Sequence, residues 1–217
     1  MDVRFDVPLY TTAEAAAHLG LARSTLRYWI AQHGLVHSVA PESPRSASLP
    51  FIAIAEAQFI RGLRNAGLTF DAVAVGIRSV RKHLGVEYII HRDRLAHDGR
   101  DILVNLAEGG AEPEWTQARD GQGGIPGIIR HGLRTIEEWA DDGYPQRVKL
   151  PTYGDADVIV DPRFAFGQPI IDRRGVRVED VAQMFLAGDK IDTVTAEFGV
   201  DRETVESIVR VYARRAA

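Results

Sequence analysis

The sequence predicts an α+β protein in three parts, with helical segments at both ends and short strands between them. Apolar residues recur at helical spacing as far as His83 and again from Val178, which indicates amphipathic helices. Short β-branched runs separated by glycine-containing turns lie between these segments and favour strands. We place the three parts at residues 1–85, 86–156 and 157–217.

Residues 11–33 predict two short helices joined by a tight turn. Either Thr11 or Thr12 can cap the first helix, because a threonine hydroxyl accepts a hydrogen bond from a backbone N–H of the first turn. Gly20 ends this helix, since glycine adopts a positive φ without strain. The inward faces of the two helices carry Ala15, Ala16, Leu19, Leu26, Trp29 and Ile30.

The outward face of the second helix, which begins at Ala22 or Ser24, is basic and carries hydroxyl groups. A compact helix pair with such a face has the geometry to enter the major groove of DNA. Tyr28 has two open roles on this face, a DNA contact or partly buried packing. We therefore expect DNA binding through Arg23, Ser24, Thr25, Arg27 and Tyr28.

A loop rich in proline and serine, residues 38–50, follows this helix pair and contains Arg45. Two longer helices come after the loop, and glycines end both of them. In the first of these, Arg61 and Arg64 are expected to face outward. The two helices are expected over Ile54–Ala66 and Phe70–His83.

Charge is unevenly distributed along the 217 residues, although the net charge is only −4. Residues 1–84 hold nine basic and six acidic residues, 85–154 hold eight and twelve, and 155–217 hold nine and twelve. The first stretch is therefore at +3, and the other two are at −4 and −3. The positive excess lies with the predicted groove-binding helices, where it would meet phosphates, and the acidic remainder is expected to face protein.

The middle part changes to short apolar runs around turn pairs such as Asp98-Gly99 and Asp142-Gly143. Residues 108–127 are rich in glycine and are expected to form a loop. Leu133–Trp139 fits either a strand or a helix. Further strands are expected at Tyr88–Ile90, Ile102–Leu106, Arg147–Leu150 and Val158–Val160.

Three helices are predicted in the C-terminal part, and the last two form a second helix-turn-helix pattern. The outward face of this pattern carries Glu203 and Glu206 beside Arg202 and Ser207, and the two carboxylates would repel DNA phosphates. This face is therefore expected to contact protein. The apolar stripes comprise Val178, Val181, Ala182, Phe185, Leu186, Ile191, Val194, Phe198, Val205, Ile208, Val209 and Tyr212.

The sequence does not support a secreted, membrane or metal-binding protein. It has no cysteine and no signal-peptide pattern at its start, and no apolar run approaches the roughly eighteen residues of a membrane span. The seven histidines have no metal-ligand spacing, and no nucleophile, base or phosphate-loop motif indicates catalysis. We expect a cytoplasmic protein with no membrane partner, enzyme activity, catalytic residue, cofactor or metal.

The N-terminal 85 residues resemble the winged helix-turn-helix of the MerR type, through Tyr10–Leu21, Thr25–Tyr28 and Phe59–Leu68. In that family the second helix gives hydroxyl, arginine and tyrosine contacts to DNA, and the wing adds an arginine. The resemblance implies these roles for Thr25, Arg27 and Tyr28, and it implies that Arg45 is the wing residue.

The chain departs from the MerR pattern in three places. Ser24 stands where a basic residue is usual, and Arg23 one position earlier can compensate for it. Trp29 stands where a second tyrosine is usual. Predicted strands after His83 replace the long dimerising helix of that family. The resemblance therefore does not carry over the family's mode of dimerisation or effector sensing.

The C-terminal part is similar to the domain-of-unknown-function family numbered 433, whose members are commonly antitoxins of VapBC-like toxin–antitoxin pairs. That family usually has Gly-Thr-Arg where this chain has Arg173-Arg174-Gly175. The order of the parts is similar to a MerR-like antitoxin of the VapB group, which implies a PIN-like ribonuclease toxin as partner. The matching runs are Val158–Pro162, Phe166–Ile171, Val176–Val181, Ala187-Gly188 and Ile191–Val200.

These features together predict a winged helix-turn-helix, a strand-rich middle and a trihelical C-terminal domain, in an antitoxin that neutralises its toxin and represses its own operon through operator DNA. A single module at +3 binds DNA weakly, so a homodimer or a toxin–antitoxin hetero-oligomer is expected. The C-terminal part or the acidic middle is expected to contact the toxin. The alternative is a free-standing MerR-like regulator with a ligand-sensing middle. Candidates for toxin binding or dimerisation are Arg173, Arg174, Phe185, Phe198, Val205, Ile208, Val209, Tyr212, Arg214 and Arg215.

Overall fold

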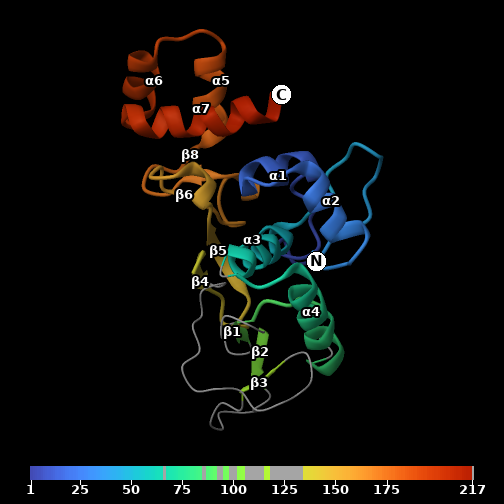
Figure 1. The fold of residues 1–217 in the computed structure, drawn as a ribbon. Coiled ribbons are helices and arrows are strands. Elements are labelled where there is room, and N and C mark those ends of the chain that lie inside the picture. The colour runs from blue at the N-terminus through green and yellow to red at the C-terminus, as the bar shows by residue number, and fades with distance from the viewer. Residues whose placement is uncertain are drawn as a thin grey trace.

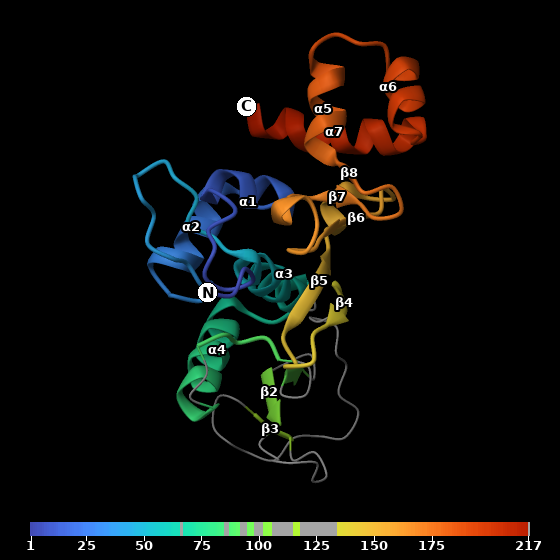
Figure 2. The same cartoon turned by 180° about the vertical axis from the view of Figure 1, so that it is seen from behind.

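The computed structural model describes residues 1–65, 67–84, 87–91, 95–97, 102–105, 115–117 and 134–216. It confirms the α+β class, with helices at both ends of the chain and antiparallel strands between them. Helices α5–α7 form one end of the molecule, α4 and strands β1–β3 form the opposite end, and α1–α3 lie between (Figures 1 and 2). The helices are α1 (Thr12–Leu19), α2 (Arg23–Ala31), α3 (Phe51–Asn65), α4 (Phe70–Leu84), α5 (Val178–Leu186), α6 (Ile191–Phe198) and α7 (Arg202–Ala216).

A five-stranded antiparallel sheet runs through the centre of the molecule. Its strand order follows the chain, β4-β5-β6-β7-β8, so each strand pairs with its neighbours in sequence. The sheet therefore crosses the boundary that we expected between residues 156 and 157. Its strands are β4 (Ile136–Trp139), β5 (Pro145–Lys149), β6 (Val158–Val160), β7 (Ile170–Ile171) and β8 (Val176–Arg177), with the short 3-10 turns η2 (Pro151–Tyr153) and η3 (Ala165–Gly167) between them.

A second, smaller antiparallel sheet has the order β1-β2-β3 and lies beside α4. Strands β1 (Leu95–His97) and β2 (Ile102–Asn105) flank the expected Asp98-Gly99 turn, which is outside the described residues. Strand β3 (Trp115–Gln117) falls inside the segment that we expected to be a loop. That prediction is wrong at these residues, because a three-residue strand is too short to show alternation in sequence.

The three C-terminal helices pack against one another, and α7 also packs against α1. Val181, Val194 and Ile208 are fully buried between them. Leu186 was expected to face inward but is 60% exposed, because it lies at the edge of the stripe, roughly 80° around the helix from Val178. None of the helices in the described ranges is both long and apolar enough to cross a membrane.

Helix α3 is enclosed on all sides over its first ten residues. Every residue from Phe51 to Ile60 is buried, whereas a helix on the surface of a protein buries one stripe. Helices α1 and α4 pack against α3, and β5 covers it from the sheet side. The N-terminal helices and the sheet therefore share one hydrophobic core.

The expected outward position of Arg61 is wrong, because its guanidinium is turned toward α1 and η2. Its guanidinium donates to the carbonyl of Leu19 and to Thr152 Oγ1, the latter at 3.0 Å. Burial lowers the pKa of Arg61. Arg64 is exposed as expected, and it donates to the carbonyl of Leu68 at 2.5 Å.

A buried carboxyl group organises the interior beside α3. The Glu56 side chain is fully buried, and it accepts hydrogen bonds from the backbone N–H groups of His37 (2.6 Å) and Ile89 (3.2 Å). Arg81 Nη2 lies 3.6 Å from Glu56 Oε1. Burial raises the pKa of Glu56 to about 7, and Arg81 and the two N–H groups oppose this shift only in part. Glu56 thus connects three parts of the chain: the segment after α2, helix α4, and the segment that leads to the small sheet.

The expected strand at Tyr88–Ile90 is wrong, because the N–H of Ile89 bonds to Glu56 instead of to a neighbouring strand. Ile89 and Ile90 are nevertheless buried, which explains why this run is apolar. Of Leu133–Trp139, residues 136–139 form a strand, so the helical alternative does not hold there.

Polar contacts also fasten the N-terminal helices to the sheet and its connections. His18 Nδ1 in α1 lies 2.6 Å from Tyr153 Oη in η2, and both side chains are buried. Arg4 Nη1 donates to Asp142 Oδ1 at 3.0 Å in the turn between β4 and β5. This hydrogen bond lowers the pKa of Asp142. The helix pair of α1 and α2 is therefore an integral part of the fold.

Replacing Glu56 with Gln should remove a pH-dependent contribution to stability. The folded-state pKa of about 7 lies above the ordinary value of 4.5, so the folded protein binds more protons in this range and loses stability as the pH rises through it. The parent should lose about 3 kcal/mol relative to Glu56→Gln between about pH 4.5 and about pH 8. Urea unfolding of both proteins across this range measures the difference, and parallel curves would contradict the role of Glu56.

Candidate nucleic-acid interface

The local sequence accounts for the geometry of the first helix-turn-helix. Thr11 is the N-cap of α1: its hydroxyl accepts from the N–H of Glu14 at 3.2 Å, and the Glu14 carboxylate accepts from the N–H of Thr11 at 2.9 Å. Gly20 ends the helix with φ 62° and ψ 34°. Ala22 is then the N-cap of α2, so this helix begins one residue before Ser24.

The face of α2 turned away from the core carries the residues expected to bind DNA. Arg23, Ser24 and Arg27 are exposed, Thr25 is half-buried, and Tyr28 is 48% exposed. Both views place α2 on the side of the molecule away from the five-stranded sheet (Figures 1 and 2). A rod-shaped partner can therefore reach this face.

Tyr28 is packed on one side and exposed on the other, so the structure is compatible with both of the roles that the sequence left open. Its ring centroid lies 4.6 Å from that of His33 and 5.8 Å from that of Phe70, so one side of the ring is packed. The exposed half of the side chain remains on the outer face of α2. Trp29, in contrast, is 5% exposed and belongs to the core.

A loop that we call the wing, residues 39–48, projects beside α2 (Figure 1). Its two ends are joined because the N–H of Val39 donates to the carbonyl of Ser48 at 2.9 Å. An isolated antiparallel bridge between Tyr10 and Leu49 anchors the wing to the segment that precedes α1 in the chain. Arg45 is exposed on the wing, within an exposed run from Ala40 to Arg45. The wing thus adds a basic side chain on the side of the molecule that carries α2.

The basic side chains of this surface have no partner in the described part of the chain: Arg23, Arg27 and Arg45 form no ion pair or hydrogen bond there. Other arginines of the N-terminal part hold the fold together through carbonyl or carboxylate groups. These are Arg4, Arg61, Arg64 and Arg81. The division leaves the cations of α2 and the wing available for an external anion.

The second helix-turn-helix repeats the backbone of the first but carries different charges. Helices α1 and α6 each have eight residues, and Gly199 after α6 has φ 63° and ψ 33°. Three residues then lead to the next helix in both cases. By position in the motif, Glu203 replaces Ser24 and Glu206 replaces Arg27. The α7 face is therefore unsuited to phosphates, as the sequence predicts.

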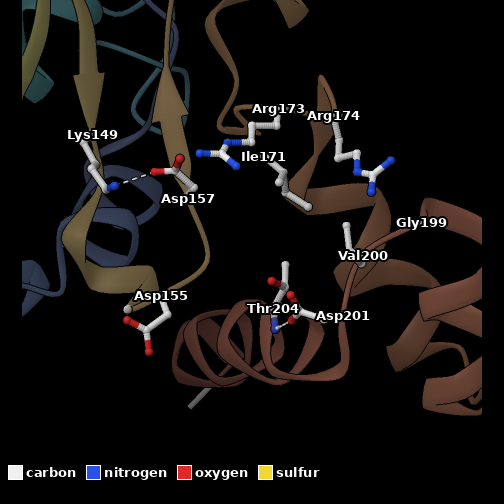
Figure 3. Close-up of a pocket in the computed structure, with 11 residues that line it drawn as sticks. Lys149, Asp155, Asp157, Ile171, Arg173, Arg174, Gly199, Val200, Asp201 and Thr204 are labelled. Atoms are coloured by element: carbon white, nitrogen blue, oxygen red, sulfur yellow. Dashed lines mark hydrogen bonds and ion pairs between the residues drawn. The ribbon is translucent and has the colours of Figure 1, made fainter.

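A cavity of about 660 Å³ lies between the β7–β8 turn and the first turn of α7 (Figure 3). Lys149 and Asp157 form an ion pair on one wall, and Asp201 on another accepts a backbone N–H of α7. The guanidinium groups of Arg173 and Arg174 extend from the turn in different directions (Figure 3). Because both acidic and basic groups line it, this cavity fits a protein surface better than a uniformly negative backbone. Its charged lining consists of Lys149, Asp155, Asp157, Arg173, Arg174 and Asp201.

The residues expected to contact a protein partner divide by exposure. Val205 and Ile208 are fully buried and form the internal core of the three helices, so they have no surface to offer a partner. Arg173 and Arg174 are exposed. The side chains of Arg214 and Arg215 lie outside the described ones. The half-buried members pack against the core and are Phe185, Phe198, Val209 and Tyr212.

No group of three or more histidine, aspartate or glutamate side chains in the described ranges is arranged to hold a metal ion.

The structure adds a feature that the sequence did not indicate. A Cβ at Gly20 would lie 3.1 Å from two atoms of the Thr152 side chain, so the turn before α2 rests directly on η2.

A helix-turn-helix with an exposed, unpaired basic face defines a DNA-binding protein of the helix-turn-helix class. Residues 8–77 match the family described as "Putative DNA-binding HTH domain", and residues 158–212 match "Protein of unknown function (DUF433)". The second match confirms the resemblance of the C-terminal part.

Similarity to single proteins extends over almost the whole chain. The chain is 33% identical over 221 residues to "Putative antitoxin VapB45" of Mycobacterium tuberculosis, which covers 92% of each sequence. The crystal structure of Rv2018 from Mycobacterium tuberculosis is similar with a TM-score of 0.68 and 28% identity, over 95% of this chain and 99% of that one. The chain belongs to the VapB45 family.

Replacing Gly20 with Ala should destabilise the protein more than replacing Gly199 with Ala. Both positions have the same positive φ, so each variant carries a strain of about 1–2 kcal/mol. At Gly20 the new Cβ also presses on Thr152, whose hydroxyl is held by Arg61, whereas at Gly199 the nearest atom is 3.5 Å away. We expect a further loss of about 1 kcal/mol for Gly20→Ala in urea unfolding. Equal losses would show that the contact with η2 does not constrain the turn.

Proposed function

We propose that this protein is an antitoxin that reads operator DNA with α2 and the wing and holds its toxin through the C-terminal part. The helix-turn-helix match and the name of the VapB45 relative support the two halves of this proposal. The resemblance of the C-terminal part implies a PIN-like ribonuclease as the toxin. In the cytoplasm, the antitoxin binds the toxin and stops the toxin's activity. It also binds DNA and represses the operon that encodes both proteins.

The observation that carries the DNA-binding half is the free cationic face of α2. An arginine without an intramolecular partner loses no interaction when it binds a guanine edge or a phosphate. Helix α2 contains two arginines and no acidic residue, and its nine residues span about 13 Å, close to the width of the major groove. Arg45 on the wing adds a contact to the flanking phosphates.

The same observation explains why two copies are needed. One module offers few cations, and each phosphate contact weakens as salt rises. Two copies on a roughly palindromic operator, with their half-sites about one DNA turn apart, double the contacts without a new kind of interaction.

Replacing Arg27 with Ala should weaken binding to the DNA upstream of the protein's own gene. If Arg27 reads a base, the loss is about 1–3 kcal/mol, or about 5- to 150-fold in Kd. Arg202→Ala in the first turn of α7 is the matched control and should change Kd by less than about twofold, because that arginine is already paired with Glu206 at 3.2 Å. Fluorescence anisotropy on labelled duplexes measures both. An Arg27→Ala protein that binds with parental affinity rules out this reading helix.

The toxin-binding half rests on the surface around the 660 Å³ cavity. Arg173 and Arg174 project from the β7–β8 turn without an ion pair in the described part of the chain. They can donate to carboxylate groups on a partner. The half-buried aromatic side chains of Phe185, Phe198 and Tyr212 extend the candidate surface. Arg214 and Arg215, whose side chains lie outside the described ones, stay candidates from the sequence.

Reversing the charge of Arg173 and Arg174 together should abolish neutralisation and leave DNA binding intact. Substitution tests this better than removal of residues 157–217, because such a truncation takes β6–β8 out of the sheet. Arg173→Glu with Arg174→Glu should bind the toxin at least about tenfold more weakly in pull-downs after co-expression with the neighbouring open reading frame. Lys190→Glu with Arg210→Glu is the control of equal charge on exposed sites. Full protection by the Arg173/Arg174 variant would exclude this surface.

A further inference from the structure

The turn between β6 and β7 exposes two aromatic rings. We call residues 163–167 the Phe loop. Phe166 is 93% exposed and Phe164 is 52% exposed. Phenylalanine is among the residues most often buried in folded proteins, so two rings exposed within three positions need an explanation.

The backbone of the Phe loop is strained in a way that keeps the rings exposed. Ala165 and Phe166 have φ of 47° and 54°, a region that residues with a side chain rarely adopt. Gly167 follows at φ 74°, and a Cβ there would lie 2.6 Å from Leu9 Cδ1. The hydroxyl of Tyr10 donates to the carbonyl of Gly167. The surrounding structure thus enforces this conformation, which is typical of functional sites.

The base of the Phe loop is also fixed, and its charges are neutralised internally. The fully buried Asp161 accepts from the N–H of Arg163 at 2.9 Å and from its Nη2 at 2.6 Å. Arg163 Nη2 also donates to Glu138 at 2.7 Å. The guanidinium lies 5.8 Å from the centroid of the Phe164 ring. The loop therefore presents rigid aromatic groups with no free cation for a phosphate.

We propose that the Phe loop is the contact through which two copies of this chain associate. Two copies of a chain with net charge −4 repel each other as whole molecules, so a contact between them is favoured at a neutral surface. The loop is apolar and locally neutral, and it can pair with its own copy across a twofold axis. Rigid aromatic side chains are effective anchors because little entropy is lost when they bind.

The position of the Phe loop leaves the DNA-reading face open. The Phe loop lies beside the start of α1, whereas α2 follows the end of α1. The contacts of Gly167 with Leu9 and Tyr10, just before α1, agree with this placement. The loop contact itself therefore uses neither Arg23 nor Arg27. The association is independent of the proposed function, but it supplies the pair of α2 helices that the proposed function requires.

The expected association is weak. Two Phe loops bury a few hundred Å², well below the roughly 1,200–2,000 Å² of stable interfaces. We expect a dimer with Kd of about 1–100 µM that is stabilised when both copies bind one palindromic operator.

Sedimentation equilibrium of the full chain without DNA, from about 1 to 200 µM, tests the proposal. Phe166→Asn removes the ring but keeps the backbone, because asparagine tolerates the left-handed region. Its melting temperature should equal or exceed that of the parent, while the dimer Kd rises at least about 100-fold. Phe164→Ser should also weaken the dimer. Leu186→Ser, which removes an equally exposed apolar side chain from α5, should leave Kd within about twofold.

A parent that stays monomeric over this range overturns the proposal, and so does a dimer that survives both phenylalanine substitutions. A monomeric parent that loses its co-expressed toxin on Phe166→Asn would assign the loop to the toxin instead. Binding of the protein to DNA that carries a single half-site distinguishes a failure of this proposal from a failure of the proposed function. Parent and Phe166→Asn should bind it equally, and a dimer that binds no half-site would refute DNA reading but not the association.

Discussion

The enclosure of α3 is the constraint on which the rest of the molecule depends. A helix buried along ten consecutive residues has no surface to give to solvent, so elements on every side must be present before it is stable. Those elements are α1, α4 and β5, and β5 lies far along the chain from α3. Glu56 lies inside this enclosure, and the backbone donors that satisfy it come from residues 37 and 89. The proposed DNA-binding module is therefore not an independent domain.

Helix α1 transmits this constraint to the recognition helix. It packs against α2 and α3 on one side and against η2 and α7 on the other. His18 contacts Tyr153 in η2, and the turn at Gly20 rests on Thr152. The orientation of α2 is thus determined partly by residues of the sheet connections, more than 120 positions away. In the proposed antitoxin, toxin-binding and DNA-binding surfaces would act on the same folding unit.

The two helix-turn-helix motifs of this chain have nearly the same backbone, and they illustrate that geometry does not decide function. The turns at Gly20 and Gly199 agree within 1° in φ and ψ, and each is followed by a helix that begins with arginine. Arg23 remains unpaired in the described part of the chain, whereas Arg202 is held by Glu206 and Asp192. The difference lies in the acidic side chains of α6 and α7. These side chains neutralise the arginine and would repel phosphates.

The sequence by itself determined what depends on local spacing. The helix-turn-helix of α1 and α2, its exposed basic face, the strands β2, β5 and β6 and the three C-terminal helices could all be predicted from it, because periodicity, caps and glycines act within a few residues. Only the tertiary structure decided the half-buried position of Arg61, the loss of the expected strand at Tyr88–Ile90 and the exposure of Phe166. Each of these depends on a partner far along the chain: Thr152, Glu56 or Tyr10. Long-range contacts of this kind leave no period in the sequence, so a single chain read alone could not reveal them.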